Sequence, residues 1–157
     1  MDRRHFVAAL AGLFAGRQAA AAGGARAPVQ KLQLPEAEWK KRLTPQQFDV
    51  LREAGTERAG SSALLAEHRN GTFVCAGCDL PLFESKTKFE SGTGWPSFYD
   101  YIRGHLETKT DFKLIIPRTE YHCARCGGHQ GHVFDDGPPP TGKRYCNNGV
   151  ALKFVPA

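Results

Sequence analysis

The sequence has no run of about 18 consecutive apolar residues, the length that a membrane-spanning helix needs, so it predicts no stable membrane insertion. It also has no concentrated basic segment outside its N-terminus. Of the formal net charge of +5, residues 1–27 carry +3, from four arginines and one aspartate, which leaves +2 for residues 28–157. Because nucleic-acid-binding proteins concentrate basic residues on one face, this distribution predicts no nucleic-acid partner.

Length and composition indicate one folded domain. A chain of 157 residues is too short for two full-sized domains, and a content of 41% hydrophobic and 24% charged residues is ordinary for a globular protein. This composition excludes a disordered chain.

Residues 1–27 have the three-part layout of an export signal: a basic start, an apolar Ala-rich stretch, and small residues up to Ala27. Arg3 and Arg4, followed by His5-Phe6-Val7, resemble a twin-arginine signal. We therefore expect export, to the periplasm of a bacterium. The alternative is a frayed basic N-terminus or a short anchor helix.

The remaining chain divides into a linker over residues 28–34 and a domain over residues 35–157. A short helix is predicted over residues 35–41. A second helix is predicted from the capping box Thr44-Pro45-Gln46-Gln47 to about Ala54, with its stop at Gly55.

Short β-strands are predicted beyond the second helix. Asn70-Gly71 between two apolar pairs is typical of a hairpin turn, and alternation predicts strands over 112–116, 131–134 and 150–154. Residues 135–142 hold three prolines and two glycines and are predicted as a loop. The pattern indicates a mainly β domain with an N-terminal helical cover.

Cys75-Ala-Gly-Cys78 and Cys123-Ala-Arg-Cys126 are two C-x-x-C motifs, which together can hold one tetrahedral Zn²⁺. Their separation is larger than in a compact zinc ribbon, so the metal would pin two distant hairpins. Four thiolates leave no open coordination position, which indicates a structural ion. The alternatives are two disulfides, or one redox-active C-x-x-C, which in a thioredoxin-like protein needs a strand–turn–helix setting.

Cys146 is the fifth, unpaired cysteine. Arg144 lies two residues before it, on the same face of a strand, and a nearby cation lowers a thiol pKa. With His129 and His132 upstream, Cys146 is a candidate nucleophile with candidate proton donors. A buried inert cysteine and hydrogen-bonded surface histidines are the alternatives.

Trp95 and Phe98 lie in a glycine-rich segment, Ser91-Gly-Thr-Gly-Trp-Pro-Ser-Phe98. They are candidates for the wall of an apolar pocket, but composition alone favours a place in the core.

Read in order, these segments resemble the methionine-R-sulfoxide reductase family of the B type. The resemblance covers residues 36–156. It rests on the two C-x-x-C motifs, the Ser91–Phe98 segment, His129-Gln-Gly-His132-Val-Phe134-Asp-Asp-Gly-Pro and Arg144-Tyr-Cys146-Asn-Asn148. It implies two antiparallel sheets with short N-terminal helices, a structural zinc, and methionine-R-sulfoxide in oxidised proteins or peptides as the substrate.

The resemblance also implies roles for single residues. Cys146 is the nucleophile that attacks the sulfoxide sulfur and becomes a sulfenic acid. His129 and His132 match the positions that bind and protonate the oxygen. Trp95 and Phe134 match the substrate wall, and Arg144 and Asn148 match positions that orient and activate the site.

Thr93 occupies the place where many members carry a second, resolving cysteine. This predicts a one-cysteine cycle in which an external thiol, a thioredoxin-like domain or a small thiol, reduces the sulfenic acid. The chain is expected to act as a monomer, and Gln130, where an apolar residue is frequent, is expected to matter little. The rival functions are a zinc-ribbon binding module, which would need only the four motif cysteines, and a C-x-x-C disulfide oxidoreductase.

Overall fold

A computed structural model describes residues 28–112 and 117–157. The helices are α1 (Glu36–Arg42) and α2 (Pro45–Glu53), with short 3₁₀ helices η1 (Ala63–Ala66), η2 (Ser85–Thr87) and η3 (Gly149–Ala151). The strands are β1 (Gly71–Cys75), β2 (Pro81–Glu84), β3 (Lys88–Phe89), β4 (Ser97–Phe98), β5 (Leu106–Asp111), β6 (Arg118–Cys123), β7 (His129–Phe134), β8 (Arg144–Asn147) and β9 (Leu152–Pro156). None of the helices in these ranges is long and apolar enough to span a membrane.

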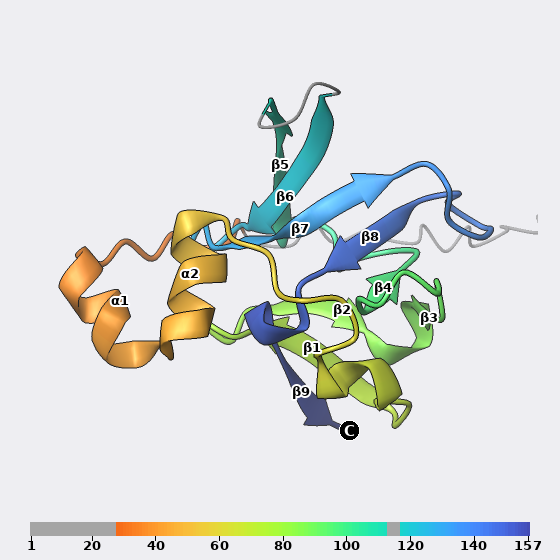
Figure 1. The fold of residues 1–157 in the computed structure, drawn as a ribbon, viewed down its shortest axis with the longest axis horizontal. Helices are drawn as coiled ribbons and strands as arrows, with labels where there is room; N and C mark the ends of the chain where they lie inside the picture. The colour runs from red at the N-terminus through yellow and green to blue at the C-terminus, as the bar shows by residue number, and fades with distance from the viewer. Residues whose placement is uncertain (1–27, 113–116) are drawn as a thin grey trace, which may run out of the picture.

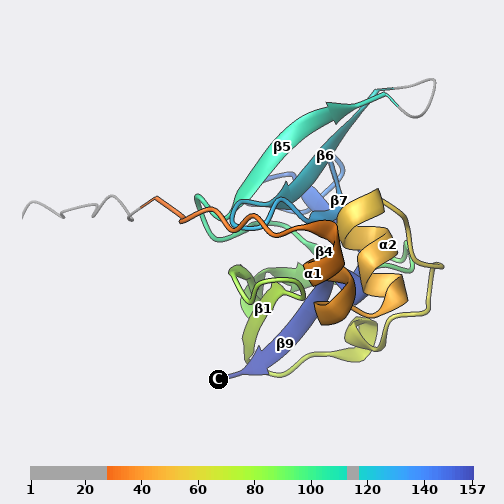
Figure 2. The same ribbon diagram turned by 90° about the vertical axis from the view of Figure 1, so that its left-hand side faces the viewer.

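The strands form two antiparallel sheets, as the resemblance implied. One sheet has the order β2-β1-β9 and the other the order β3-β4-β8-β7-β6-β5. Figure 1 shows the two sheets one above the other, with α1 and α2 beside them. The β5–β6 hairpin extends away from the body of the domain (Figure 2).

The second helix begins and ends close to its predicted bounds. Thr44 Oγ1 accepts from Gln47 N at 3.2 Å, and Gln47 Oε1 accepts from Thr44 N at 3.1 Å, so the predicted capping box is present. Ala54, with φ 52°, takes the left-handed position at the C-terminus. Gly55 is needed for space instead, because a Cβ there would lie 2.1 Å from Asp49 Oδ2.

The predicted hairpin at Asn70-Gly71 is wrong. Leu64 and Leu65 belong to η1, where the Ser62 side chain caps the turn, and not to a strand. Gly71 begins β1, whose hairpin partner β2 lies beyond the first C-x-x-C motif. A Cβ on Gly71 would lie 2.3 Å from Val155 O, so glycine here allows the close approach of β9.

The other predicted segments have mixed outcomes. The strand predicted over 131–134 exists and begins earlier, at His129, and residues 135–142 contain no helix or strand. The last strand begins at Leu152, because Val150 belongs to η3. Most of the strand predicted over 112–116 lies outside the described residues.

An aromatic cluster joins the two sheets. Phe83 of β2 stacks on Phe98 of β4 with ring centroids 4.1 Å apart, and Phe73 of β1 contacts the same ring at 5.0 Å. Tyr121 of β6 meets Phe83 edge-on at 6.2 Å. All four rings are fully buried, so this cluster is the centre of the hydrophobic core.

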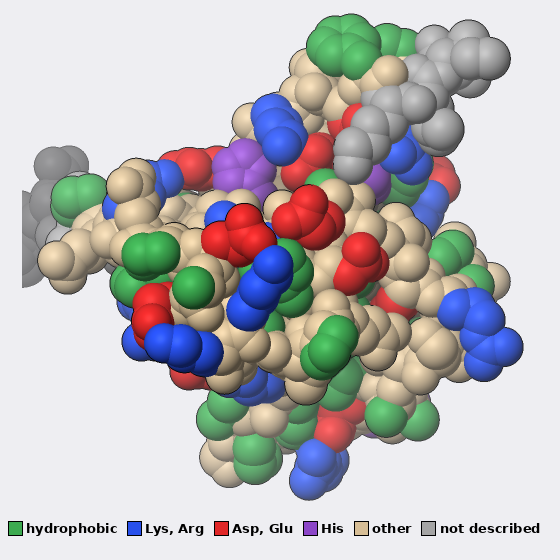
Figure 3. Space-filling model, turned by 60° about the vertical axis from the view of Figure 1, so that its left-hand side comes forward, with side chains coloured by type: hydrophobic (Ala, Val, Ile, Leu, Met, Phe, Trp, Pro, Cys, Tyr) green, Lys and Arg blue, Asp and Glu red, His purple; other side chains and the backbone are tan. Residues whose placement is uncertain are grey.

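The surface on the helical side carries charges of both signs. Figure 3 shows acidic and basic side chains interspersed there, with hydrophobic side chains in small separate groups. Residues 28–34, predicted as a linker, have no helix or strand and lie against the domain, where Leu32 N donates to Arg125 O at 2.8 Å.

Candidate active site and metal centre

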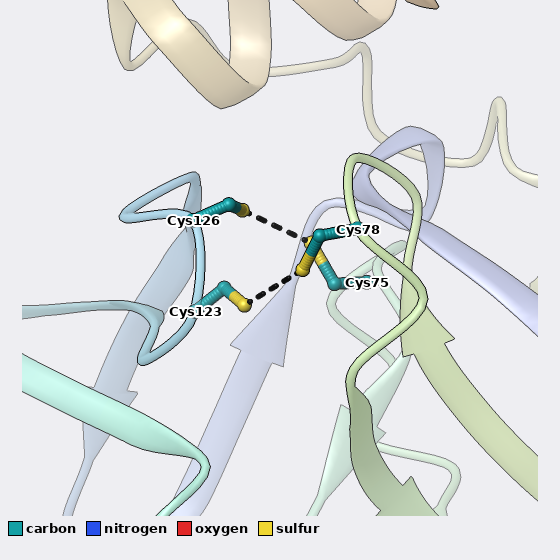
Figure 4. A group of neighbouring side chains, drawn as sticks. All are labelled: Cys75, Cys78, Cys123 and Cys126. Atoms are coloured by element: carbon teal, nitrogen blue, oxygen red, sulfur yellow. Dashed lines mark hydrogen bonds between the residues drawn. The ribbon is translucent and has the colours of Figure 1, made fainter. Parts of the chain in front are cut away.

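The two C-x-x-C motifs meet in space. Cys75 ends β1 and Cys78 lies in the turn before β2, while Cys123 ends β6 and Cys126 lies in the turn before β7. The four Sγ atoms lie within 4.8 Å of one another. Figure 4 shows two contacts that cross between the turns, from Cys75 to Cys126 at 3.6 Å and from Cys78 to Cys123 at 3.5 Å.

This arrangement fits a tetrahedral metal ion. Four thiolates at about 2.3 Å from one Zn²⁺ have sulfur–sulfur distances of about 3.8 Å. Hydrogen bonds with the Cys123 sulfur lower the pKa of Cys78 and Cys126 and raise that of Cys75, while the bond with Cys126 raises the pKa of Cys123. The four sulfurs therefore cannot all be thiolates together unless a bound cation offsets their negative charges.

The surroundings of the cluster are strand–turn–strand on both sides, which differs from the strand–turn–helix setting of a thioredoxin-like motif. All five cysteines are free thiols. Two arginines tie the turns to their surroundings: Arg125 Nη1 donates to Cys78 O at 3.0 Å, and Arg52 Nη1 of α2 donates to Cys126 O at 2.9 Å.

Cys146 lies in the middle of β8, opposite Ser97 of β4 and His132 of β7. Its side chain lines a cavity of about 130 Å³. The cavity is lined by Thr56, Trp95, Arg118, Gly131, His132, Phe134, Cys146, Asn147 and Asn148. The structure thus brings together five of the predicted site residues, Trp95, His132, Phe134, Cys146 and Asn148.

Trp95 and Phe98 separate in the structure. Phe98 is fully buried in the core, whereas Trp95 is half-buried and stands on the cavity wall. The composition-based preference for Trp95 in the core is therefore wrong. Its indole Nε1 donates to Glu57 O at 3.2 Å, which fixes the edge of the ring.

A β-bulge brings the two predicted histidines together. Residues three apart on a regular strand point to opposite faces. Tyr121 pairs with Gly131 but the next residue, His122, pairs with His129, so β7 carries one extra residue at this point. The ring centroids of His129 and His132 are consequently 5.5 Å apart. His132 lines the cavity, and His129 is buried behind it.

Each histidine has a buried carboxylate partner that the sequence did not suggest. His129 Nδ1 is 2.9 Å from Glu120 Oε1, and His132 Nε2 is 2.7 Å from Asp111 Oδ2. Arg118 Nη2 donates to the same Asp111 oxygen at 2.8 Å. Burial works to raise the pKa of Glu120, but the hydrogen bonds and charges of His129 and Lys109 together outweigh it and lower that pKa, which keeps a carboxylate beside the ring.

Arg144 lies beside the cavity and not on its wall. Its guanidinium makes two hydrogen bonds of 2.8 Å to Asp136 and stacks over the Phe134 ring at 4.4 Å. It therefore stabilises the Phe134 side of the cavity. Asn148, on the opposite side, donates Nδ2–H to Gln130 O at 3.0 Å and accepts from Glu57 N through Oδ1 at 3.0 Å.

The expected activation of the Cys146 thiol by Arg144 is only partial. Burial raises the pKa of Cys146, whereas the Arg144 charge and a hydrogen bond from the Thr93 hydroxyl lower it. The burial effect is larger, so the net direction is upward from the ordinary value of 9.0. Arg144 thus acts on the Cys146 pKa in the expected direction, but burial of the thiol outweighs its effect.

Gln130 has more contacts than its predicted minor role suggests. Its side chain is fully buried. Its Nε2 donates to Cys75 Sγ at 3.4 Å, and its Oε1 accepts from Asn147 Nδ2 at 3.5 Å. Gln130 therefore connects the cysteine cluster to the floor of the cavity.

We predict that the rate of Cys146 alkylation by iodoacetamide continues to rise above pH 9.0, because only the thiolate reacts and burial raises its pKa. Arg144→Met should slow the reaction at pH 8 by roughly two- to tenfold, because it removes a cation that favours the thiolate. Arg69→Met, which removes an arginine stacked on Phe154 of β9, is the matched control. A midpoint below 9.0, or faster alkylation in Arg144→Met, would contradict this assignment.

Comparison with known proteins identifies the family. Residues 43–156 match the family described as the SelR domain. The chain is 55% identical over 122 residues to the chloroplastic peptide methionine sulfoxide reductase B1 of Arabidopsis thaliana, covering 77% of this chain and 60% of that protein. It is 56% identical over 120 residues to peptide methionine sulfoxide reductase MsrB of Methanosarcina barkeri, covering 76% and 84%. The MsrB of Leptospira interrogans is 52% identical over 120 residues, covering 76% and 92%. This chain belongs to the SelR-domain family, and these peptide methionine sulfoxide reductases of the B type are its relatives.

Proposed function

We propose that this protein reduces methionine-R-sulfoxide in oxidised proteins to methionine, with Cys146 as the nucleophile. The observation that carries the proposal is the Cys146 side chain in a cavity of about 130 Å³ between aromatic walls and His132. A cavity of this size suits the end of one side chain. Trp95 and Phe134 provide apolar surface for the methyl and methylene groups, and His132 provides a polar group for the oxygen.

The reaction exchanges one oxidation equivalent between two sulfur atoms. The Cys146 sulfur attacks the sulfoxide sulfur and forms a sulfur–sulfur bond, while the sulfur–oxygen bond breaks and the protonated oxygen leaves as water. A water molecule then adds its oxygen to the Cys146 sulfur, which breaks the sulfur–sulfur bond and releases methionine. Methionine sulfoxide and a thiol thus become methionine and a sulfenic acid, which is the first step of cysteine oxidation. The substrate sulfur is reduced by two electrons and the Cys146 sulfur is oxidised by two.

The proton that the oxygen needs is available inside the site. Because the pKa of Cys146 is raised, the residue begins as a thiol at neutral pH and its proton can accompany the oxygen. His132 lies directly opposite Cys146, and its Nε2 is 2.7 Å from Asp111 Oδ2, which orients the ring. We assign His132 to proton transfer to the oxygen, and His129 with Glu120 to support of that ring.

Regeneration requires a thiol from outside the chain. Thr93 stands where a resolving cysteine would stand, and the other four cysteines form the separate cluster. The sulfenic acid then reacts with two external thiols and yields the Cys146 thiol, one disulfide and water. A thioredoxin-like domain or a small thiol can supply these electrons.

The four-cysteine cluster is the site for one structural Zn²⁺. Cys75, Cys78, Cys123 and Cys126 would all be ligands, which leaves no open position for substrate. The bound ion would hold the β1–β2 and β6–β7 turns together and would contribute to folding rather than to the chemical step.

Turnover of a methionine-sulfoxide peptide, with the R and S epimers measured separately and dithiothreitol as reductant, tests the proposal. We predict turnover of the R epimer only, and a loss of at least about 10³-fold in Cys146→Ser because that variant lacks the nucleophile. Cys146→Ser should keep its metal and its fold. Equal turnover of both epimers, or full activity in Cys146→Ser, would refute the proposal.

Metal removal tests the structural role. We predict one zinc per chain and, after chelation, a loss of roughly 3–5 kcal/mol of unfolding free energy, which lowers the Tm by about 10–20 °C. Cys126→Ser should reproduce this loss, because it removes one of the four ligands, whereas Cys146→Ser should not. Zinc content and thermal unfolding are the measurements. An unchanged Tm in the chelated protein would argue against a structural metal.

We also propose that residues 1–27 direct export to the periplasm, where proteins are exposed to oxidants. The basis is the Arg3-Arg4 pair and the apolar, Ala-rich stretch that follows it. The full chain expressed in a bacterium should yield a periplasmic form that has lost these residues, as read by intact mass, and Arg3→Lys with Arg4→Lys should retain it in the cytoplasm. A full-length periplasmic form, or export that the double variant leaves unchanged, would count against this signal.

A further inference from the structure

Glu57 is a buried carboxylate outside the set of predicted site residues. It lies in the loop between α2 and η1 and is only 6% exposed. Its Oε1 accepts from Gly149 N at 2.6 Å and its Oε2 accepts from Val150 N at 2.9 Å. Each carboxylate oxygen therefore has a backbone partner at the start of η3, immediately after Asn148.

The backbone of the same residue contacts two walls of the cavity. Glu57 N donates to Asn148 Oδ1 at 3.0 Å, and Glu57 O accepts from Trp95 Nε1 at 3.2 Å. Trp95 comes from the segment before β4, and Asn148 from the segment between β8 and β9. One residue of the α2–η1 loop thus connects two cavity walls that lie far apart in the sequence.

The surrounding loop reinforces this connection. Gly60 N donates to Gly94 O at 2.7 Å, directly before Trp95. A Cβ on Gly149 would lie 1.9 Å from Ser62 Oγ, so η3 packs tightly against the end of the loop. The neighbouring Thr56 lines the cavity itself. The loop is therefore part of the cavity and has little room to move relative to Asn148.

We propose that Glu57 is a positioning residue for the reduction, which holds the Trp95 ring and the Asn148 amide in place around Cys146. This inference rests on the proposed function. Without the carboxylate, the Gly149 and Val150 N–H groups lose their acceptors and the loop loses its attachment to η3. The backbone atoms that hold Trp95 and Asn148 then shift with the loop.

The experiment compares Glu57→Ala and Glu57→Gln with Thr44→Ala, a capping variant of α2 that contacts no cavity residue in the hydrogen bonds described. We expect kcat/KM for the R-sulfoxide peptide to fall by roughly 30- to 100-fold in Glu57→Ala, because misplacement of binding groups by about 1 Å can cost this much. Glu57→Gln keeps one acceptor and should lose less, roughly 3- to 10-fold. Thr44→Ala should lower the Tm without changing kcat/KM.

A second readout follows Trp95 directly. The indole N–H resonance of Trp95, assigned with Trp39→Phe, should shift and exchange faster with solvent in both Glu57 variants, and should stay unchanged in Thr44→Ala. Glu57 would be merely structural if its variants lost stability while kcat/KM and this resonance stayed the same. If Glu57→Ala fails to fold, Glu57→Gln decides alone. If the wild-type protein shows no turnover while the Trp95 indole resonance still shifts in Glu57→Gln, the proposed function is overturned. The positioning of Trp95 by Glu57 is then retained.

Discussion

Four sulfur atoms within 4.8 Å of one another determine how the two sheets of this protein meet. They fix the β1–β2 turn of the smaller sheet against the β6–β7 turn of the larger one. Gln130, at the start of β7, donates to Cys75 Sγ at 3.4 Å, and its backbone O accepts from Asn148 Nδ2 at 3.0 Å. The cysteine cluster and the cavity are therefore connected through one buried residue. A metal bound in this cluster would act on the reaction by holding β7 in place.

The cavity itself balances burial against reactivity. Cys146, between β4 and β7, is partly buried, and this burial raises the pKa of the thiol. Arg144 offsets part of the effect, but its guanidinium is shared with Asp136 and the Phe134 ring. In the proposed reduction this balance has a use, because the substrate oxygen must gain a proton as the sulfur–oxygen bond breaks. A thiol beside a carboxylate-supported histidine supplies both the nucleophile and the proton.

Local signals in the sequence predicted local features. The Thr44 capping box, the two C-x-x-C turns and the strand that holds His132 are all found in the structure. The Asn70-Gly71 signal failed, because the apolar residues before it form η1 and the close approach of β9 is what requires Gly71. Turn propensity alone does not distinguish these two uses of glycine.

Long-range partners were not predictable from the sequence. Asp111 and Glu120 meet the histidines across β5, β6 and β7, and Glu57 reaches Asn148 from a loop 91 residues away. No spacing in the sequence reports such contacts, because they depend on strand register. The bulge in β7 is a similar case, since His129 and His132 share a face only after one residue is added to the strand.

In the proposed reaction Cys146, and no other group of the protein, is oxidised as the substrate is reduced. Purified wild-type protein, with its metal bound and without reductant, would be mixed with one equivalent of an R-sulfoxide peptide and then with dimedone, and analysed by peptide mass spectrometry. We expect about one equivalent of methionine peptide and a dimedone adduct on Cys146 alone. An intramolecular disulfide that includes Cys146, or methionine formed while Cys146 stays unmodified, would contradict it.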